Sequence, residues 1–337
     1  MAPRIGLIAV ATDTGLGYQT RSYYKHLNPS KVIIIDISSL NGRQQHYDWY
    51  ENAHLVKGIP NEAQLRHLLK DIDVLLTAET GYNLSIYAIA RDMGVKTVCV
   101  ENAEFFDGFK YPEYQLPDLI ILPSVWKEQE IRDFAEPRGT KVIQLHHPVD
   151  RDEIKFRLRD TNKPMHVAGT PATYDRNGTW DYLRAYPTGL VTTQNDDLAR
   201  HIRMRYPRGV VYTNIEDLNM MYSLGDILVL PRKYGGNCLV LNEALASGMP
   251  VIMTDIEPNN HLLPKEWLVP ATTTQSFTPR GKVDIYDVDI PLLTEKIDWM
   301  RSQNIGQLSE QANQIAETIS WDTLKDKWLK ALEDICG

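Results

Sequence analysis

The sequence predicts an α/β protein with two doubly wound parallel sheets, in which helices cover both faces of each sheet. Short apolar runs alternate with helical patterns along the chain, and such runs are typical of strands that are buried on both faces. The chain has 337 residues, which is too long for one typical domain. Hydrophobic residues make up 43% of it, so each half has enough apolar side chains for its own core.

The strand candidates fall into two series. Those of the first half lie at residues 5–10, 32–35, 74–76, 97–100, 119–122 and 142–145. Those of the second half lie at 166–168, 189–192, 210–212, 227–230 and 251–253. Pro148 and the charged segment 151–164 interrupt the pattern, so we expect a first domain at 1–150 and a second at 151–318. The segment 319–337 has the periodicity of a closing helix.

Charge and cysteine content exclude several classes of protein. The net charge is −8 and both halves are acidic, which argues against binding to nucleic acid through its phosphates. The arginines at 200, 203, 205 and 208 are a local exception that we interpret as a solvated helix face. Three scattered cysteines are too few for a disulfide framework. No signal-peptide or transmembrane pattern is evident, so we expect a cytoplasmic protein, in the host cytoplasm if a phage encodes it.

The most informative segment is 228–255, which predicts a buried strand, a glycine turn, a helix and a second buried strand. Gly235 and Gly236 allow close approach of the backbone to a ligand, and the following helix presents free N–H groups to an anion. Arg232 and Lys233 precede the glycines, where two cations can stabilise a departing nucleotide diphosphate without a metal. Glu243 lies two turns into the helix and can reach a hydroxylated group beside the anion. The segment therefore predicts a site for a phosphate and a ribose.

Two further loops follow strands. Gly15 and Gly17 form a tight turn before a helix, which suits a phosphate or a sugar. Thr20 stands where a dinucleotide-binding fingerprint has its third glycine, although Asp36 at the end of the second strand keeps that interpretation open. Arg176 lies at the predicted start of another helix, where it suits either a diphosphate clamp or a surface turn.

Metal, hydrolase and redox motifs are absent from the sequence. His146 and His147 are adjacent and cannot form an i, i+4 ligand pair, and no HExxH motif occurs. The sequence also lacks the GxSxG and CxxC motifs. We therefore expect no metal and no cofactor.

Several segments together resemble retaining GT-B glycosyltransferases of family 4. YGGNCLVLNEALASGMPVIMTD, at 234–255, resembles the donor-site motif of that family, commonly written EGFGLVxLEAMAxGxPVVAT. IEDLNMMYSLGDILVLP looks like the helix and strand that precede the motif, and ISWDTLKDKWLKAL is similar to the family's closing helix. The resemblance implies two Rossmann-like domains that face a central cleft. It assigns the acceptor to the first domain and the nucleotide-sugar donor to the second, with the closing helix returning to the first.

The resemblance also implies roles for individual residues. Glu243 matches the glutamate that holds the nucleotide ribose, and Arg176 matches the lysine of the family's diphosphate clamp. Gly17 matches the first-domain loop that closes over the donor phosphates. The expected donor-binding residues are thus Gly15, Gly17, Gly169, Thr170, Arg176, Tyr234, Gly235, Gly236, Asn237, Cys238, Leu239 and Glu243.

The chain departs from the family motif at three places. Gly235 replaces the first glutamate of the donor motif, which contacts the donor sugar, so Lys233 or Tyr234 is a candidate for that contact. Thr170 replaces the clamp arginine. Glu101 and Asn102 stand near the position of a first-domain histidine and are candidates for contact with the acceptor or the sugar.

The implied reaction moves a hexose or pentose from a UDP- or GDP-type donor to an acceptor hydroxyl with retention of configuration. The leaving diphosphate, held by Arg176, Lys233 and helix amides, takes the acceptor proton without an enzyme nucleophile. Two alternatives stay open: a degenerate member that binds a nucleotide or sugar without turnover, and an enzyme that modifies a hydroxymethylated DNA base of a phage. Glycan, protein and lipid acceptors, and any oligomeric state, are also open.

Overall fold

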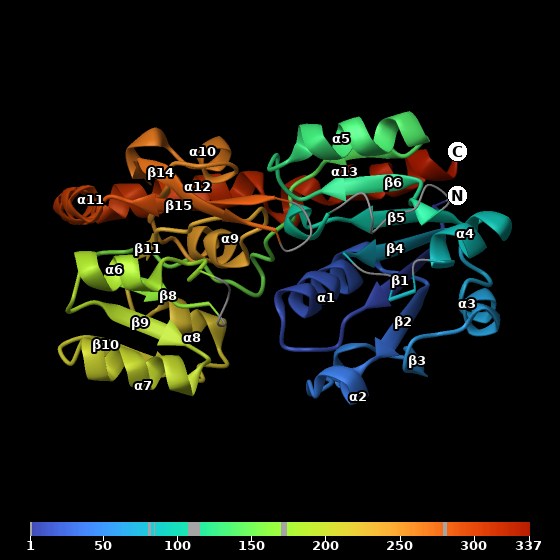
Figure 1. The fold of residues 1–337 in the computed structure, drawn as a ribbon, viewed down its shortest axis with the longest axis horizontal. Helices are drawn as coiled ribbons and strands as arrows, with labels where there is room; N and C mark the ends of the chain where they lie inside the picture. The colour runs from blue at the N-terminus through green and yellow to red at the C-terminus, as the bar shows by residue number, and fades with distance from the viewer. Residues whose placement is uncertain (1, 80–81, 84, 107–114, 170–173, 279–281) are drawn as a thin grey trace. The chain divides into compact units, whose positions relative to one another are not determined.

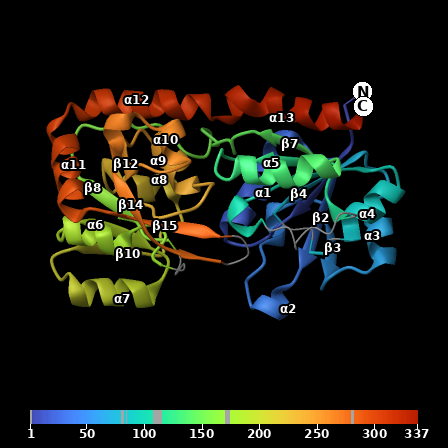
Figure 2. The same ribbon diagram turned by 45° about the horizontal axis from the view of Figure 1, so that its top comes forward.

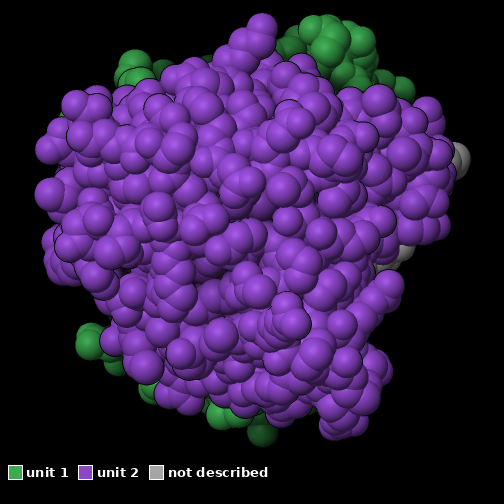
Figure 3. Space-filling view, turned by 90° about the vertical axis from the view of Figure 1, so that its left-hand side faces the viewer, with its two compact units in different colours: residues 1–147, 324–337 green, residues 148–323 purple. Residues whose placement is uncertain are grey.

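The structure is a computed structural model that describes residues 2–79, 82–83, 85–106, 115–169, 174–278 and 282–337. It forms two compact units, Met1–His147 with Leu324–Gly337, and Pro148–Thr323 (Figures 1 and 3). Each unit contains its own parallel sheet with helices between the strands. The predicted fold class, two doubly wound parallel sheets, is therefore confirmed.

The first unit has a parallel sheet with the strand order β3-β2-β1-β4-β5-β6-β7. Its strands are β1 Ile5–Ala9, β2 Lys31–Asp36, β3 His54–Lys57, β4 Val74–Ala78, β5 Lys96–Val100, β6 Leu119–Leu122 and β7 Lys141–Gln144. Its helices before the unit boundary are α1 Gly15–Leu27, α2 Ser38–Asn41, α3 Glu62–Leu68, α4 Ser85–Asp92 and α5 Glu128–Ala135. All of the central strands coincide with predicted apolar runs, because sheet strands covered on both faces need apolar side chains in succession.

Strand β3 is a strand that the sequence analysis missed. Val56 is buried, but the other three residues of the strand are exposed. The strand pairs with β2 at one edge of the sheet. A short, polar edge strand carries no continuous apolar run, which is also how such edges avoid pairing with other chains.

The last helix, α13 Trp321–Cys336, contributes its main part to the first unit (Figure 2). The ring of Trp328 lies 4.9 Å from that of Tyr23 on α1, and both side chains are fully buried. The Trp328 indole N–H donates to the His146 carbonyl oxygen at 3.2 Å. The carboxyl end of the chain thus supplies a core residue to the amino-terminal unit.

The second unit has a parallel sheet with the order β10-β9-β8-β11-β12-β13 and a separate antiparallel hairpin. The strands are β8 Pro164–Val167, β9 Leu190–Thr193, β10 Val210–Thr213, β11 Ile227–Leu230, β12 Val251–Thr254 and β13 Leu268–Val269, and the hairpin pairs β14 Ala271–Phe277 with β15 Val283–Val288. The helices are α6 Thr179–Ala185, α7 Asp196–Arg205, α8 Leu218–Tyr222, α9 Leu239–Ala246, α10 Asn259–Leu262, α11 Ile290–Ser302 and α12 Ile305–Thr318. The hairpin and β13 were not predicted, since β14 is largely exposed and β13 has two residues.

The order of strands in the second unit reverses between β8 and β11. The chain moves outward from β8 through β9 to β10, then returns so that β11 pairs with the other side of β8. Ligands of open α/β sheets bind outside the carboxyl ends of strands at such a switch point. The segment before α6 and the turn after β11 meet at this place, because the Lys233 N–H donates to the Arg176 carbonyl and Gly178 lies against Pro231. The fold therefore puts residues 174–178 and 231–238 next to each other.

Candidate functional site

The turn between β11 and α9 has a conformation that requires glycine. Gly235 has φ +111°, in a region of backbone space that side-chain-bearing residues rarely adopt. A Cβ atom at this position would lie 2.5 Å from Nη2 of Arg232. The sequence suggests that Gly235 admits a ligand to the backbone, and the structure adds that Gly235 makes room for the guanidinium of Arg232.

The amino terminus of α9 is open to an anion. Cys238 is the N-cap residue, its side chain makes no capping hydrogen bond, and the first turn holds no acidic residue. The first amides of a helix lack partners within the helix and carry the positive end of its dipole. The predicted anion site of Asn237, Cys238 and Leu239 thus has backbone donors that no side-chain cap occupies.

Glu243, on α9, has a partner that the sequence analysis did not identify. The hydroxyl of buried Tyr222, on α8, donates to Oε2 of Glu243 at 2.7 Å. Burial raises the pKa of Glu243 to about 7, although the bond from Tyr222 opposes this rise. The carboxyl group therefore changes its charge near neutral pH, in a setting where a second hydroxyl donor would favour the ionised form.

The loop before α6 brings Arg176 to the turn after β11. The Arg176 carbonyl accepts from the Lys233 N–H at 2.8 Å, and its guanidinium lies over the Tyr234 ring, 5.5 Å from the centroid. The amino terminus of α6 is already capped, because the Asp175 carboxylate accepts from Thr179 N–H at 3.0 Å and Trp180 N–H at 2.9 Å. Burial raises the pKa of Asp175. An anion would therefore meet the Arg176 side chain and not free amides of α6.

Lys233 is held by two carboxylates. Its Nζ lies 2.9 Å from Asp181 Oδ2 and 2.5 Å from Asp287 Oδ1, and the Lys233 side chain is 12% exposed. Burial lowers the pKa of Lys233, but the bonds to Asp287 and Asp181 outweigh burial, so its pKa lies above the usual value. The Lys233 carbonyl also accepts from the Tyr286 N–H at 3.0 Å. Lys233 thereby joins the turn to α6 and to β15, and its charge is balanced within the unit.

The other predicted donor residues of the second unit have packing roles. A Cβ atom on Gly169 would lie 3.1 Å from the Asn177 amide nitrogen, which donates to the Val167 carbonyl at 3.0 Å. The Tyr234 ring is buried edge-on against Phe277, with centroids 5.2 Å apart. Thr170 lies outside the described residues.

Gly15 and Gly17 lie in the first turn of α1, so the prediction that they form a tight turn before the helix is wrong. Close packing of α1 on β1 explains why Gly17 is glycine. A Cβ atom on Gly17 would lie 1.8 Å from the Thr12 carbonyl oxygen and 3.2 Å from that of Val10. The Gly17 N–H donates to Thr14 Oγ1 at 3.2 Å, which caps the helix. Thr20, in place of a third glycine, is buried and accepts from the Val10 N–H at 3.0 Å. The Thr20 side chain therefore fills the space that a dinucleotide-binding fold keeps for glycine.

Replacing Gly17 by alanine is expected to destabilise the first unit by about 3 kcal/mol, because the new methyl group must displace a backbone carbonyl. Thermal or urea unfolding of the variant measures the loss. Gly306→Ala is the matched control: Gly306 is also helical, its Cβ would meet nothing nearer than 3.4 Å, and this variant is expected to be neutral or slightly stabilised. Equal unfolding midpoints for wild type and Gly17→Ala would contradict the expectation.

Glu101 and Asn102 follow β5 in the first unit. Glu101 is fully buried, and its Oε2 lies 3.6 Å from the Cys99 Sγ. Asn102 has its Oδ1 buried without a hydrogen-bond partner. Both residues follow the carboxyl end of the central strand β5, and their contact with an acceptor or a sugar stays a prediction.

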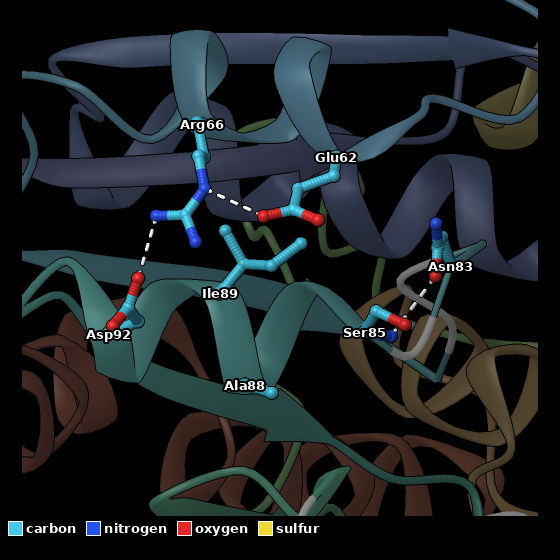
Figure 4. A pocket seen from close by; sticks show the side chains of 7 residues that line it. All are labelled: Glu62, Arg66, Asn83, Ser85, Ala88, Ile89 and Asp92. Carbon is cyan, nitrogen blue, oxygen red and sulfur yellow. Dashed lines mark hydrogen bonds and ion pairs between the residues drawn. The ribbon is translucent and has the colours of Figure 1, made fainter.

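Two cavities of the first unit differ in their surroundings. One, of about 190 Å³, lies beside the Gly15–Gly17 turn and is lined by Thr12, Thr14, Leu16 and Arg43 among others. The second, of about 280 Å³, lies between α3 and α4 (Figure 4). There Arg66 bonds to Glu62 at 2.9 Å and to Asp92 at 2.7 Å, so its charge is balanced. The first cavity thus adjoins a predicted site, whereas the second holds an arginine already paired with two carboxylates.

The described residues contain neither a metal-binding cluster nor a membrane-spanning helix. Within them, no three His, Cys, Asp or Glu side chains are grouped so that they would hold a metal ion. In the same part of the chain, no helix has both the length and the apolar character needed to cross a bilayer.

Residues 186–279 match the family model described as Glycosyl transferases group 1. The matched segment contains the turn after β11 and the whole of α9, with Lys233 and Glu243, and it begins after Arg176. No curated protein sequence is significantly similar to this chain.

The chain is similar in fold to solved glycosyltransferases. A glycosyltransferase from Rickettsia africae has 13% identity and a TM-score of 0.70, with 98% of each chain covered. HepE from Anabaena in complex with UDP has 12% identity and a TM-score of 0.70, with 98% of this chain and 99% of that chain covered. An α-glucosyltransferase in complex with UDP and a 13-mer DNA has 11% identity and a TM-score of 0.60, with all of both chains covered. At these identities the likeness concerns the fold, which is GT-B.

Proposed function

We propose that the chain is a glycosyltransferase that moves a sugar from a nucleoside diphosphate sugar to an acceptor hydroxyl with retention of configuration. The observation that carries the proposal is the family match over β11 and α9, where an open helix terminus lies next to the turn and Glu243 lies further along the same helix. The UDP in the structures of HepE and of the α-glucosyltransferase supports a UDP-linked sugar as the donor.

Four groups of the second unit have a defined part in the proposed donor site. The first-turn amides of α9 and the Arg176 guanidinium bind the diphosphate, and the Glu243 carboxylate accepts hydrogen bonds from the ribose hydroxyls. Lys233 holds the turn against α6 and β15, because its charge is already shared with Asp181 and Asp287. The proposed site requires no metal, since the arginine and the helix amides balance the diphosphate charge.

The proposed reaction breaks the bond between the anomeric carbon and the diphosphate oxygen and forms a bond from that carbon to the acceptor oxygen. The acceptor proton passes to the departing diphosphate on the same face of the sugar, and a nucleoside diphosphate is released. The protein supplies orientation and electrostatic stabilisation of the leaving group, and no side chain becomes covalently attached.

The test is a panel of UDP- and GDP-linked hexoses and pentoses, offered with simple alcohol, glycan and lipid acceptors. We expect release of nucleoside diphosphate and a product with the donor's anomeric configuration, measured by mass spectrometry and NMR, with the same rate in a metal chelator. Binding of nucleotides without release of diphosphate under any acceptor would favour a binding protein without turnover. An inverted product would exclude retention.

A hydroxymethylated DNA base is a second candidate acceptor, because the structurally similar α-glucosyltransferase was solved with DNA that contains an HMU base. The arginines of α7 argue against a phosphate-binding face. Arg200 pairs with Asp197 at 3.1 Å, Arg203 donates to a backbone carbonyl, and Arg205 lies over the Trp180 ring. Sugar transfer to hydroxymethylated but not to plain duplex DNA would establish this acceptor.

A further inference from the structure

Arg232 is a buried cation with most of its hydrogen-bonding capacity unused. The residue is 3% exposed, and Nη2 donates to the Asn237 carbonyl oxygen at 3.0 Å. Its Nε and Nη1 atoms are buried and have no hydrogen-bond partner. Removing a charged group from water without pairing it is costly, so such a group in a folded protein indicates a ligand or a functional task.

Two neighbouring cations show what a structural role looks like in this chain. The Arg159 guanidinium, 2% exposed, donates to the carbonyls of Tyr222, Gly225 and Ser247 and to the Ser247 hydroxyl, so that only its Nε is buried without a partner. Lys233 is paired with two carboxylates. Arg232 makes one bond to a neutral carbonyl, and no carboxylate of the described residues pairs with it. Of the two cations before the glycine pair, Arg232 is therefore the one without a carboxylate partner among the described residues.

Arg232 lies beside the open amino terminus of α9. The Asn237 carbonyl that it binds belongs to the residue before the N-cap, Cys238. No side chain caps this terminus, whereas the Asp175 carboxylate occupies that of α6. An unpaired guanidinium and an uncapped helix terminus thus lie on the same turn, and both are complementary to an oxyanion.

Gly235 permits this arrangement. A side chain there would come within 2.5 Å of the guanidinium, and an acidic side chain would also neutralise it. The absence of a carboxylate at position 235 therefore leaves the turn with a net positive charge, which is a physical reason for glycine beyond the positive φ angle.

We propose that Arg232 binds a phosphate oxygen of the donor diphosphate together with the first-turn amides of α9. This inference rests on the proposed function, because it takes the ligand to be a nucleoside diphosphate or its sugar. Since Nε and Nη1 are buried, binding includes a small shift of the turn that exposes them to the phosphate. Of the two cations that the sequence analysis placed beside the departing diphosphate, Arg232 then contacts it and Lys233 holds the turn.

The test compares Arg232→Gln and Arg232→Lys with wild type and with Arg200→Gln, an exposed arginine on α7. Calorimetry measures the dissociation constants of UDP, GDP and the corresponding nucleosides. For the nucleotide that wild type prefers, we expect Arg232→Gln to weaken diphosphate binding at least tenfold and nucleoside binding less than twofold. Arg232→Lys keeps the charge and is expected to retain diphosphate affinity within about fivefold. Arg200→Gln is expected to match wild type.

The outcomes separate this inference from the proposed function. Wild type that binds no nucleoside diphosphate would remove the proposed function itself. Wild type that binds UDP or GDP, with Arg232→Gln within twofold of it, would overturn the role of Arg232 alone. Equal loss of diphosphate and nucleoside binding would also overturn it, because that result indicates a purely structural arginine. If Arg232→Gln does not fold, a twentyfold or greater loss of diphosphate affinity in the charge-retaining Arg232→Lys would contradict the proposal.

Discussion

Arg176→Ala is expected to lower kcat/KM for sugar transfer by about 30- to 1,000-fold, equivalent to about 2 to 4 kcal/mol of transition-state stabilisation. Negative charge on the diphosphate grows as the bond to the sugar breaks, so a fixed guanidinium stabilises the transition state more than the ground state. The Arg176 side chain is held for this role by the Tyr234 ring, and its backbone by the Lys233 N–H. Steady-state kinetics with the preferred donor measures the change.

Arg176→Lys and Arg200→Ala are the controls for this experiment. The lysine keeps the charge but lacks the planar group that stacks on Tyr234, so it is expected to recover part of the activity. Arg200 is exposed on α7, and its alanine variant is expected to retain full activity. Activity of Arg176→Ala within twofold of wild type would exclude Arg176 from the stabilisation of the leaving group.

Donor affinity is expected to rise with pH, with a midpoint near pH 7 and a plateau above about pH 8, because Glu243 must ionise to accept two ribose hydroxyl bonds. A nucleotide sugar is the right ligand, since its diphosphate has no terminal phosphate that titrates near pH 6. Glu243→Gln should bind the nucleotide sugar about tenfold more weakly than wild type above pH 7, and its affinity should not depend on pH in this way. Calorimetry between pH 5.5 and 8.5 measures both effects.

Tyr222→Phe provides an independent check on the same titration. The hydroxyl of Tyr222 stabilises the Glu243 carboxylate, so its loss should move the midpoint of the affinity curve to higher pH. The stability of the ligand-free protein should show the opposite trend to affinity. Because the folded-state pKa lies above the ordinary value of 4.5, ionisation of Glu243 destabilises the fold as pH rises from about 4.5 to about 7. An unchanged pH profile in Glu243→Gln would exclude Glu243 as the titrating group.

The strands that the sequence predicted are those whose burial leaves a direct mark on composition. Every residue of β1, β4 and β11 is buried, so the apolar run and the strand coincide. Strand β14 exposes most of its side chains and pairs with β15, so neither hairpin strand produces a fully apolar run. The hairpin is held by tertiary contacts, and one of them is the hydrogen bond from the Tyr286 N–H on β15 to the Lys233 carbonyl.

The site was predictable as a set of positions but not as a set of pairs. The sequence identified the glycine turn, the open helix and Glu243 because these lie within one short segment. It did not identify Tyr222 as the partner of Glu243, or Asp181 and Asp287 as partners of Lys233, because those residues come from other elements. Two adjacent cations therefore looked equivalent in the sequence, whereas the fold pairs Lys233 and leaves Arg232 unpaired.

The contact between Gly178 and Pro231 limits how this donor site can be altered. Gly178 has φ +72°, and a Cβ atom there would lie 2.2 Å from the Pro231 carbonyl oxygen, so the start of α6 touches the end of β11 with no space to spare. The Lys233–Arg176 backbone bond fastens the same two loops a few residues further on. A change of donor by redesign would therefore have to rebuild both loops at once, because an insertion in either one displaces the other.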